Sequence, residues 1–283
     1  MNYLSLMLLT LCLGFGFKVG ADDKSDQTTR TARIVKPHKE LNKELQKPPQ
    51  KEKKNLAIGG EVRQYSYAEP GFVSHTGYLF GIWGEWSWDS ALGFGKTSAN
   101  LLFGALSYEG QACNLSGTTC TPLTATTNDM IAKIGARLEH VFNPAFRIFY
   151  GGGFRYLYDK GEGSSFYTRT GEWVFLPVGL NFETDTALGN IFLELEYDYT
   201  IYGVMKSGLS EVSSTLNDII SNQKGGYGLV VSGGIALGEN LTTALIYESW
   251  NANDSDIMAS GGQNFREPAN SSQAFGLRVG YSF

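Results

Sequence analysis

The stretch Ala274-Phe275-Gly276-Leu277-Arg278-Val279-Gly280-Tyr281-Ser282-Phe283, which ends the chain, decides the fold class. Its alternate positions Phe275, Leu277, Val279, Tyr281 and Phe283 are all apolar, whereas the positions between them hold Gly, Arg and Ser. Successive side chains of a β-strand point to opposite faces. The pattern therefore predicts a strand with one apolar face and one polar face.

The same period of two recurs upstream, most clearly in the middle of the chain. Leu193, Leu195, Tyr197 and Tyr199, for example, alternate with Glu194, Glu196 and Asp198. Ten such strands are predicted, each long enough to cross a bilayer at a tilt. Their approximate spans are 56–67, 72–88, 97–108, 129–142, 146–159, 171–184, 190–203, 226–238, 241–251 and 272–283. With 35 Gly and 13% aromatic residues, the sequence predicts one all-β domain.

The apolar faces of these strands favour a membrane over water. Away from the N-terminus, no run reaches the roughly 20 apolar residues of a membrane helix, so only a closed barrel would span a bilayer. The apolar faces carry no charge, and aromatic residues such as Tyr156, Tyr199 and Tyr281 gather toward strand ends. We therefore expect a transmembrane antiparallel up-and-down β-barrel. The alternative is a soluble secreted barrel with its apolar face turned inward.

The segments between the predicted strands alternate between short turns and long polar loops. The long ones span 109–128, 160–170, 204–225 and 252–271, as expected of external loops opposite short periplasmic turns. In 204–225, the apolar residues Leu209, Val212, Leu216, Ile219 and Ile220 have helical spacing. They indicate either an amphipathic helical turn across the barrel mouth or a loop that packs its own apolar residues.

The N-terminal part divides into two segments before the barrel at 56–283. Residues 1–21 have the apolar core and small-residue end of a secretory signal peptide. Cys12 would mark a lipoprotein instead, but Leu11 before it is not small. Residues 22–55 hold ten Lys or Arg against six Asp or Glu and no aromatic residue, so we expect a disordered periplasmic tether. The tether is either simply solvated or a contact for an anionic periplasmic partner.

Two cysteines remain after the signal peptide. Cys113 and Cys120 lie close together in a Ser/Thr/Gly-rich stretch. In an oxidising compartment this spacing predicts a disulfide within an external loop. The alternative is two free thiols.

The polar faces of the predicted strands carry charges of both signs. Glu194, Glu196 and Asp198 form an acidic ladder on one strand. The cations expected to face the lumen are Arg63, Lys133, Arg137, Arg147, Arg155 and Arg278. A ten-stranded barrel is closer to the filled eight-stranded barrels than to open sixteen-stranded porins, so we expect a charge network that fills a narrow lumen. The alternative is a porin-like, cation-biased diffusion pore with the ladder at its constriction.

Catalysis finds little support in the sequence. A membrane-embedded hydrolase would need a Ser, a His and a carboxylate or Asn that converge, but the histidines beyond the signal peptide are only His38, His75 and His140. We expect no enzyme, no cofactor and no metal. Nucleic-acid and nucleotide binding are not expected either, because the Gly-rich strands form no phosphate loop before a helix.

Region 56–283 resembles the outer-membrane β-barrel proteins of Gram-negative bacteria, especially the small porin-like and opacity-like surface barrels. The residues that carry the resemblance are 154–159 (Phe-Arg-Tyr-Leu-Tyr-Asp), 175–180 (Phe-Leu-Pro-Val-Gly-Leu), 196–199 (Glu-Tyr-Asp-Tyr) and 276–283. The resemblance implies an outer-membrane location with both ends of the barrel in the periplasm, and contact with lipid. It also implies that the terminal strand, with Phe275, Leu277, Val279, Tyr281 and Phe283, acts as an insertion signal for the barrel-assembly machinery. It identifies no activity, so the role expected is structural or surface-interacting through long external loops.

Overall fold

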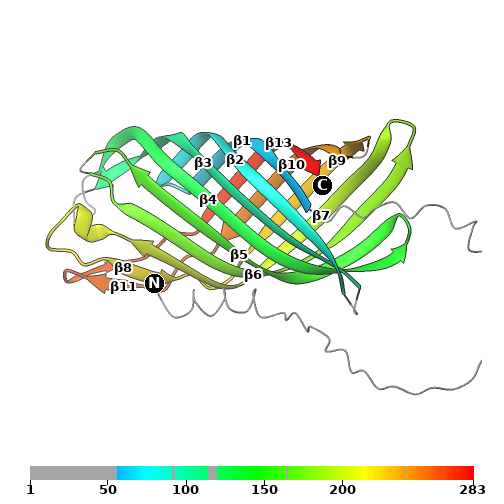
Figure 1. Cartoon of the computed structure of the whole chain (residues 1–283). Helices are drawn as coiled ribbons and strands as arrows, with labels where there is room; N and C mark the ends of the chain where they lie inside the picture. Colours follow the sequence, from blue (N-terminus) through cyan, green and yellow to red (C-terminus); the bar gives the residue numbers. More distant parts are fainter. Residues whose placement is uncertain (1–55, 91–92, 114–119, 164, 239) are drawn as a thin grey trace, which may run out of the picture. The chain divides into compact units, whose positions relative to one another are not determined.

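The computed structural model describes residues 56–90, 93–113, 120–163, 165–238 and 240–283 (Figure 1). The predicted signal peptide 1–21 and tether 22–55 lie outside the described residues. The same holds for the side chains of Ser90, Ala112 and Cys113.

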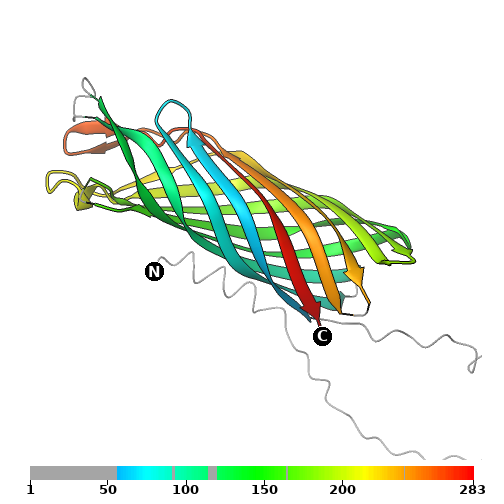
Figure 2. The same cartoon turned by 90° about the horizontal axis from the view of Figure 1, so that it is seen from above.

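Ten long antiparallel strands of the described chain close into a barrel (Figures 1 and 2). Strands adjacent in the chain are neighbours in the wall, β6 pairs with β7, and the first strand, β1, pairs with the last, β13. The prediction of an all-β up-and-down barrel of ten strands is confirmed. The strands are β1 (Leu56–Glu69), β2 (Val73–Ser90), β3 (Gly93–Cys113), β4 (Cys120–Asn143), β5 (Phe146–Gly161), β6 (Thr168–Thr186), β7 (Gly189–Ser207), β9 (Gly226–Leu237), β10 (Leu241–Ala252) and β13 (Asn270–Ser282).

Four short elements lie at the end of the barrel opposite the C-terminus (Figure 1). They are the 3-10 helix η1 (Leu209–Glu211), β8 (Ile219–Asn222), and the hairpin of β11 (Met258–Ser260) and β12 (Gln263–Phe265). β8 pairs with β7 beyond the point where β9 leaves it. None of the helices in the described part of the chain has the length and apolar character needed to cross a membrane.

Most of the predicted loop 109–128 is strand, so that prediction was wrong. β3 continues to Cys113 and β4 begins at Cys120, and the two are paired along their whole extension. Residues such as Thr124 and Thr126 keep their β-propensity. The loop boundary was predicted from the point at which apolar and polar residues stop alternating. They stop alternating here because the outer face of the strands carries polar side chains.

The helical turn considered for 204–225 is limited to the three residues of η1. Ile219 and Ile220 belong to β8 instead. Leu209, Leu216 and Ile219 are buried together, whereas Val212 and Ile220 are exposed. The loop therefore packs its own apolar residues, which was the other interpretation of the pattern.

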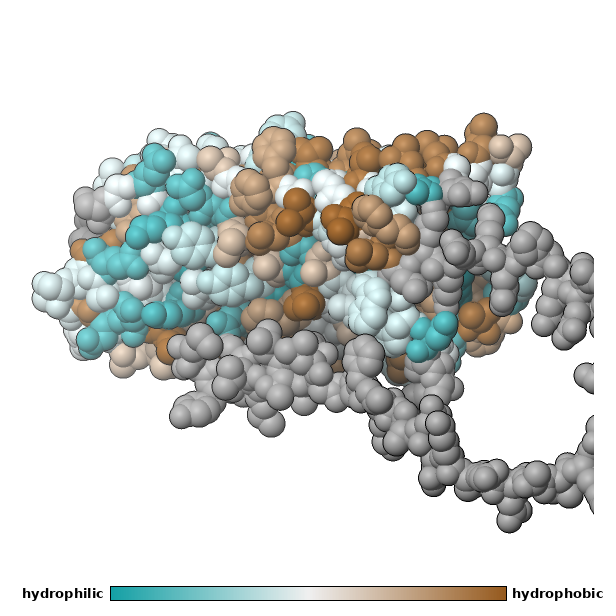
Figure 3. Space-filling view, viewed as in Figure 1, coloured by the Kyte–Doolittle hydropathy of each residue, from teal (hydrophilic) through white to brown (hydrophobic). Residues whose placement is uncertain are grey.

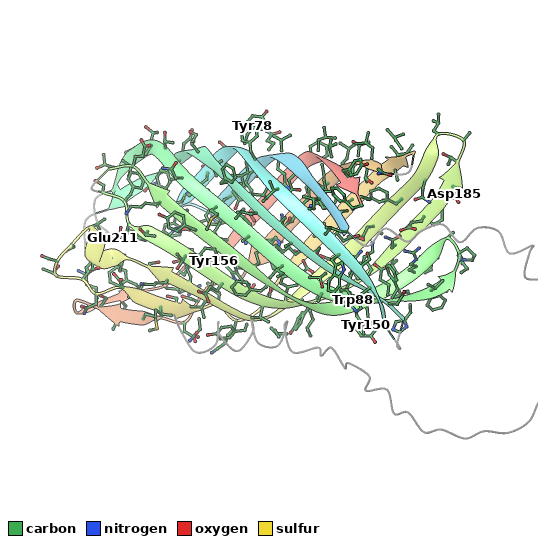
Figure 4. The ribbon with its side chains drawn as sticks, in the orientation of Figure 1. Tyr78, Trp88, Tyr150, Tyr156, Asp185 and Glu211 are labelled. Atoms are coloured by element: carbon green, nitrogen blue, oxygen red, sulfur yellow. The ribbon has the colours of Figure 1, made fainter. Side chains whose placement is uncertain are left out.

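Exposed apolar side chains form a belt on the part of the barrel nearer Leu56 and Phe283, and Figure 3 shows one face of it. Two aromatic levels border it. In Figure 4, Tyr78 and Tyr156 lie on the side toward Glu211, and Trp88 and Tyr150 lie on the side toward Asp185. Such a belt between aromatic girdles is the outer surface expected of a barrel in a bilayer. Its exposed members include Ile58, Phe80, Ile82, Phe103, Leu176, Val178, Leu193, Leu195, Leu245, Leu277 and Val279.

The inner face of the terminal strand shows why glycine alternates with the apolar residues there. A Cβ atom at Gly280 would lie 2.2 Å from Trp83 Cζ2, and one at Gly276 would lie 2.1 Å from the Val62 carbonyl oxygen. Only glycine leaves this space, and the guanidinium of Arg278 lies 4.8 Å from the centre of the Trp83 ring. The glycines of β13 therefore make room for lumen side chains from β1 and β2.

Candidate functional site in the barrel lumen

Ion pairs centred on Glu61 join the neighbouring strands β1, β13 and β10 on the lumen face inside the belt. The carboxylate oxygen Oε2 of Glu61 accepts hydrogen bonds from Arg63 Nη2 at 3.0 Å and from Arg278 Nη2 at 2.9 Å. Arg63 Nη1 donates to Glu248 Oε2 of β10 at 2.6 Å. The Arg63 side chain is 1% exposed, so these are desolvated, charge-assisted hydrogen bonds.

The acidic ladder of β7 is neutralised by cations from β4. Lys133 Nζ lies 2.9 Å from Glu196 Oε1 and 2.7 Å from Asp198 Oδ2. Arg137 pairs with Glu194, and its Nη1 lies 3.5 Å from Glu196 Oε2. Each carboxylate of the ladder therefore has a cationic partner, so the ladder is part of the lumen packing.

The network continues toward the end of the barrel where Leu56 and Phe283 lie. Arg147 Nη2 is 3.0 Å from Glu183 Oε2, and Arg147 Nη1 is 3.5 Å from Glu139 Oε2. Glu139 Oε1 also accepts a hydrogen bond from Arg137 Nε at 3.1 Å. The buried Glu139 therefore links the ladder to the last cation of the network.

Arg155 is held more by aromatic rings than by carboxylates. Its Nη2 donates to Ser272 Oγ at 3.4 Å, and its Nε lies 3.9 Å from Glu248 Oε1. Its guanidinium carbon is 5.4 Å from the Trp173 ring centre and 5.0 Å from the Trp250 ring centre. Cation–π contact with two tryptophans stabilises this buried charge.

The structure places all the predicted lumen charges on the inner face, each with polar or aromatic contacts. They are Arg63, Lys133, Arg137, Arg147, Arg155, Glu194, Glu196, Asp198 and Arg278. The sequence interpretation missed Glu61, Glu139 and Glu248. The signal was present, because Glu61 and Glu139 each lie two positions from a predicted inward arginine and so share its face.

A layer of buried apolar and aromatic side chains lies beyond the ion pairs, toward β8 and β11. Two cavities in or beside it have volumes of about 10 Å³ each, and both are lined by Tyr65, Arg155, Trp250 and Ser272. Such a volume holds about one water molecule. Side chains therefore fill the lumen at this level. The layer includes Tyr65, Tyr67, Leu79, Leu102, Leu106, Ile131, Leu157, Trp173, Met205 and Ala274.

A second charge cluster surrounds Arg169 beyond the apolar layer. Arg169 Nε lies 3.1 Å from Asp159 Oδ2, and Arg169 Nη1 lies 3.3 Å from Glu267 Oε1 and also contacts Glu69. Tyr67 Oη donates to Glu69 Oε1 at 2.7 Å. One arginine thus serves three buried carboxylates that come from β1, β5 and the segment before β13.

This imbalance shifts the protonation of the cluster. Burial raises the pKa of Glu267 to about 7 although Arg169 acts in the opposite direction, and the nearby Glu69 and Asp159 raise it further.

His75 is buried beside this cluster at 1% exposure. Its Nδ1 lies 3.3 Å from Asp129 Oδ2 and 3.5 Å from Thr127 Oγ1. Both neighbours approach the same ring nitrogen. A catalytic triad instead needs a histidine that bridges a nucleophile and a carboxylate through its two nitrogens. Among the described residues, no group of three or more His, Cys, Asp and Glu is placed to hold a metal ion.

The segments 208–222 and 253–269, together with Tyr167, form what we call the external cap, where external means the end of the barrel opposite Phe283. Leu209, Leu216 and Ile219 pack with Tyr167, Met258 and Phe265. The backbone N–H of Asn217 donates to Ser260 Oγ at 2.8 Å, and that of Glu267 donates to Ser255 Oγ at 2.9 Å. The cap is therefore joined to itself by a small apolar core and to the barrel by Glu267.

Cys113 and Cys120 are register partners at the end of the β3–β4 hairpin. Since the side chain of Cys113 lies outside the described residues, a bridge between these two cysteines stays a prediction.

Comparison with known proteins gives structural relatives only. Neither a protein-family model nor a curated protein matches the sequence. The outer-membrane protease OmpT of Escherichia coli is 9% identical with a TM-score of 0.51, and the alignment covers 81% of this chain and 97% of that one. Neisserial surface protein A is also 9% identical, with a TM-score of 0.38, over 81% of this chain and 97% of that one. The attachment invasion locus protein Ail of Yersinia pestis is 11% identical, with a TM-score of 0.36, over 82% of this chain and 99% of that one.

By fold, therefore, the protein is a closed antiparallel β-barrel similar to that of the outer-membrane protease OmpT. The resemblance inferred from the sequence is confirmed at the level of the fold. At such low identity, the likeness to OmpT carries no activity to this chain.

Proposed function

We propose that this protein is a sealed barrel of the Gram-negative outer membrane that acts at the cell surface through its external part. The observation that carries the proposal is the filled lumen, with an ion-pair network inside the belt and an apolar layer beyond it. The cavities at that layer hold about one water each, so a hydrated ion would have to displace packed side chains.

The location and orientation are part of the same proposal. The belt and its aromatic girdles support insertion in a bilayer. Leu56 and Phe283 lie at the end of the barrel with the short turn between β6 and β7, which supports a periplasmic position for both ends of the barrel. The terminal strand would then serve as the insertion signal for the barrel-assembly machinery, and the predicted tether 22–55 would extend into the periplasm.

Single-channel recording in planar bilayers tests the sealed lumen. Purified protein, shown to be folded by its heat-modifiable mobility on gels, should give no reproducible conductance steps. The rival function is a cation-biased pore. It requires steps in the unmodified protein that lose cation selectivity in the Glu194→Ala, Glu196→Ala, Asp198→Ala triple variant. That result would overturn the sealed barrel.

A further inference from the structure

A group of buried carboxylates beside the external cap is short of positive charge. Arg169 pairs with Glu69 of β1, Asp159 of β5 and Glu267 of the cap. Asp129 of β4 adds a fourth carboxylate, because it is the direct cross-strand partner of Asp159. Each of these four acidic residues is no more than 5% exposed. We call Glu69, Asp129, Asp159 and Glu267 the acid cluster.

Asp129 is the member of the acid cluster whose charge is least matched. Its Oδ2 lies 3.3 Å from His75 Nδ1, and the imidazole adds positive charge only when it is protonated. Its Oδ1 has no hydrogen-bond partner among the described residues. Carboxylates directly opposite each other on neighbouring strands repel, as Asp129 and Asp159 do here. Even with His75 protonated, four carboxylates share two positive groups, so the acid cluster requires a further cation or bound protons.

The surroundings favour an ammonium ion over a metal ion. The ring centres of Tyr67 and Tyr108 lie 5.3 Å and 5.2 Å from that of His75, so two aromatic rings border the acid cluster. Aromatic faces attract ammonium ions, and a primary ammonium group also has three N–H donors for carboxylate oxygens. Calcium and magnesium instead need several oxygen ligands around one point. Across the described part of the chain, no group of three or more His, Cys, Asp and Glu is placed to hold a metal ion.

The external cap closes one side of the acid cluster. Glu267 lies in segment 253–269, and its Oε2 accepts a hydrogen bond from Ser207 Oγ of β7 at 3.5 Å. Its backbone N–H donates to Ser255 Oγ of the same segment. Glu267 therefore belongs to the cap, whereas the other three members of the acid cluster belong to strands of the barrel wall. An opening of the cap would expose these three carboxylates to a small ligand.

We propose that the acid cluster binds the ammonium group of a small primary amine, which enters when the external cap opens and is enclosed when the cap closes. Asp129 Oδ1 would accept one of its hydrogen bonds, and the neighbouring Asp159 and Glu267 would add negative charge around it. This binding site goes beyond the proposed function, since it depends on neither a pore nor a bilayer.

Protons compete with the amine for the acid cluster. The ionisable groups that face Glu267 are Arg169, Glu69, Asp159, Tyr67 and Tyr167. Burial raises the pKa of Glu267 to about 7, although Arg169 opposes the shift and the two carboxylates add to it. Above pH 7 Glu267 is ionised and attracts the amine, whereas at pH 5 it is neutral, and the two phenols stay neutral at both. The amine should therefore bind more tightly at pH 8 than at pH 5.

Amide hydrogen exchange of the full-length protein in detergent tests the proposal. The probe is propylammonium chloride at about 20 mM and pH 8, and the control is tetramethylammonium chloride at the same concentration, which has the same charge but no N–H donor. Protection of segment 253–269, which reports closure of the cap, should be roughly tenfold higher with propylammonium, as expected for a Kd of about 2 mM. Equal protection in the two salts would overturn the proposal.

The same comparison at pH 5 separates amine binding from protonation alone. There propylammonium should change the protection of segment 253–269 by less than about twofold, because protons already neutralise part of the acid cluster. A cap that responds to pH, but not to propylammonium at pH 8, would show that protons alone complete the acid cluster. That result would also overturn the proposal.

Asp129→Asn tests the site itself, since it removes one charge of the acid cluster but none of the ion pairs of Arg169. The effect of propylammonium at pH 8 should fall at least about threefold in that variant. The matched control is Asp218→Asn, which removes an exposed carboxylate of the cap that pairs with Lys206 and should leave the effect unchanged. An effect that is lost in Asp218→Asn but kept in Asp129→Asn would place the amine on the cap surface and contradict the proposal.

Heat-modifiable mobility on gels shows whether each variant is folded. If Asp129→Asn does not fold, the comparison of the two salts on the unmodified chain still decides the proposal. None of these outcomes depends on conductance, so failure here is distinguishable from failure of the sealed-barrel proposal.

Discussion

The belt part and the external part of the barrel are built from the same strands but have opposite outer surfaces. Within the belt the outward positions of β1, β2 and β13 hold Ile58, Phe80 and Leu277. Beyond it, the same strands present Ser66, Thr76 and Gln273. The period of two determines which side chains face outward. Whether these outward side chains are apolar or polar depends on whether that part of the barrel faces lipid.

The interiors of the two parts also differ, in their charge balance. In the belt part, Glu61 and Glu248 face Arg63, Arg155 and Arg278, so opposite charges roughly match. In the external part, Arg169 alone serves Glu69, Asp159 and Glu267. A balanced interior mainly contributes stability and sealing. An unbalanced one must also bind protons, which makes it sensitive to pH.

The largest effect should come from breaking the balanced interior. Arg63→Ala leaves Glu61 and Glu248 buried with weaker pairing, so we expect a loss of about 3–5 kcal/mol in the free energy of unfolding. Urea unfolding in lipid vesicles, followed by tryptophan fluorescence, measures it. The control is Lys160→Ala, which breaks a partly exposed pair and should cost less than about 1 kcal/mol. Equal losses of unfolding free energy in Arg63→Ala and Lys160→Ala would contradict the stabilising role of the balanced interior.

The outer surfaces should respond to a lysine in opposite ways. Leu195→Lys puts a charge in the belt and should cost about 2–4 kcal/mol if its position lies near the bilayer midplane. Ser107→Lys, on the external part of β3, should change stability by less than about 0.5 kcal/mol. The same urea titration compares them. A tolerated Leu195→Lys would mean that the belt does not face lipid.

The unbalanced cluster should make the external cap pH-dependent. The pKa of Glu267 is about 7 in place and returns toward 4.5 when the cap opens. Glu267 therefore stabilises the closed cap by up to about 3 kcal/mol below about pH 4.5. This stabilisation is lost as the pH rises through 7. Amide hydrogen exchange of segment 253–269, corrected for intrinsic rates, should show at least roughly tenfold less protection at pH 8 than at pH 5.

Glu267→Gln is the control for this dependence, since it keeps the shape of the side chain but removes its titration. Most of the pH dependence should disappear in that variant. A cap that is equally protected at both pH values in the unmodified protein would contradict the unbalanced interior.

The strands inside the belt were predictable because alternation there is strong, as in β7 and β13. The extension of β3 and β4 to Cys113 and Cys120 was not, because with small polar residues outside, the sequence loses its contrast between faces. For the site, the alternation of faces along each strand was enough to predict that the cations and the ladder of Glu194, Glu196 and Asp198 point into the lumen. Their pairing did not, because Lys133 and Asp198 are 65 positions apart in the chain and meet only across the lumen.

By itself the sequence determined that the chain forms a barrel of about ten strands and which face of each strand is apolar, because these depend on a local period of two. Only the tertiary structure decided the number of strands, how the lumen charges pair, and that Arg169 gathers three carboxylates. Each of these depends on closure of the barrel, which brings β1 beside β13 and sets the register between strands distant in the chain.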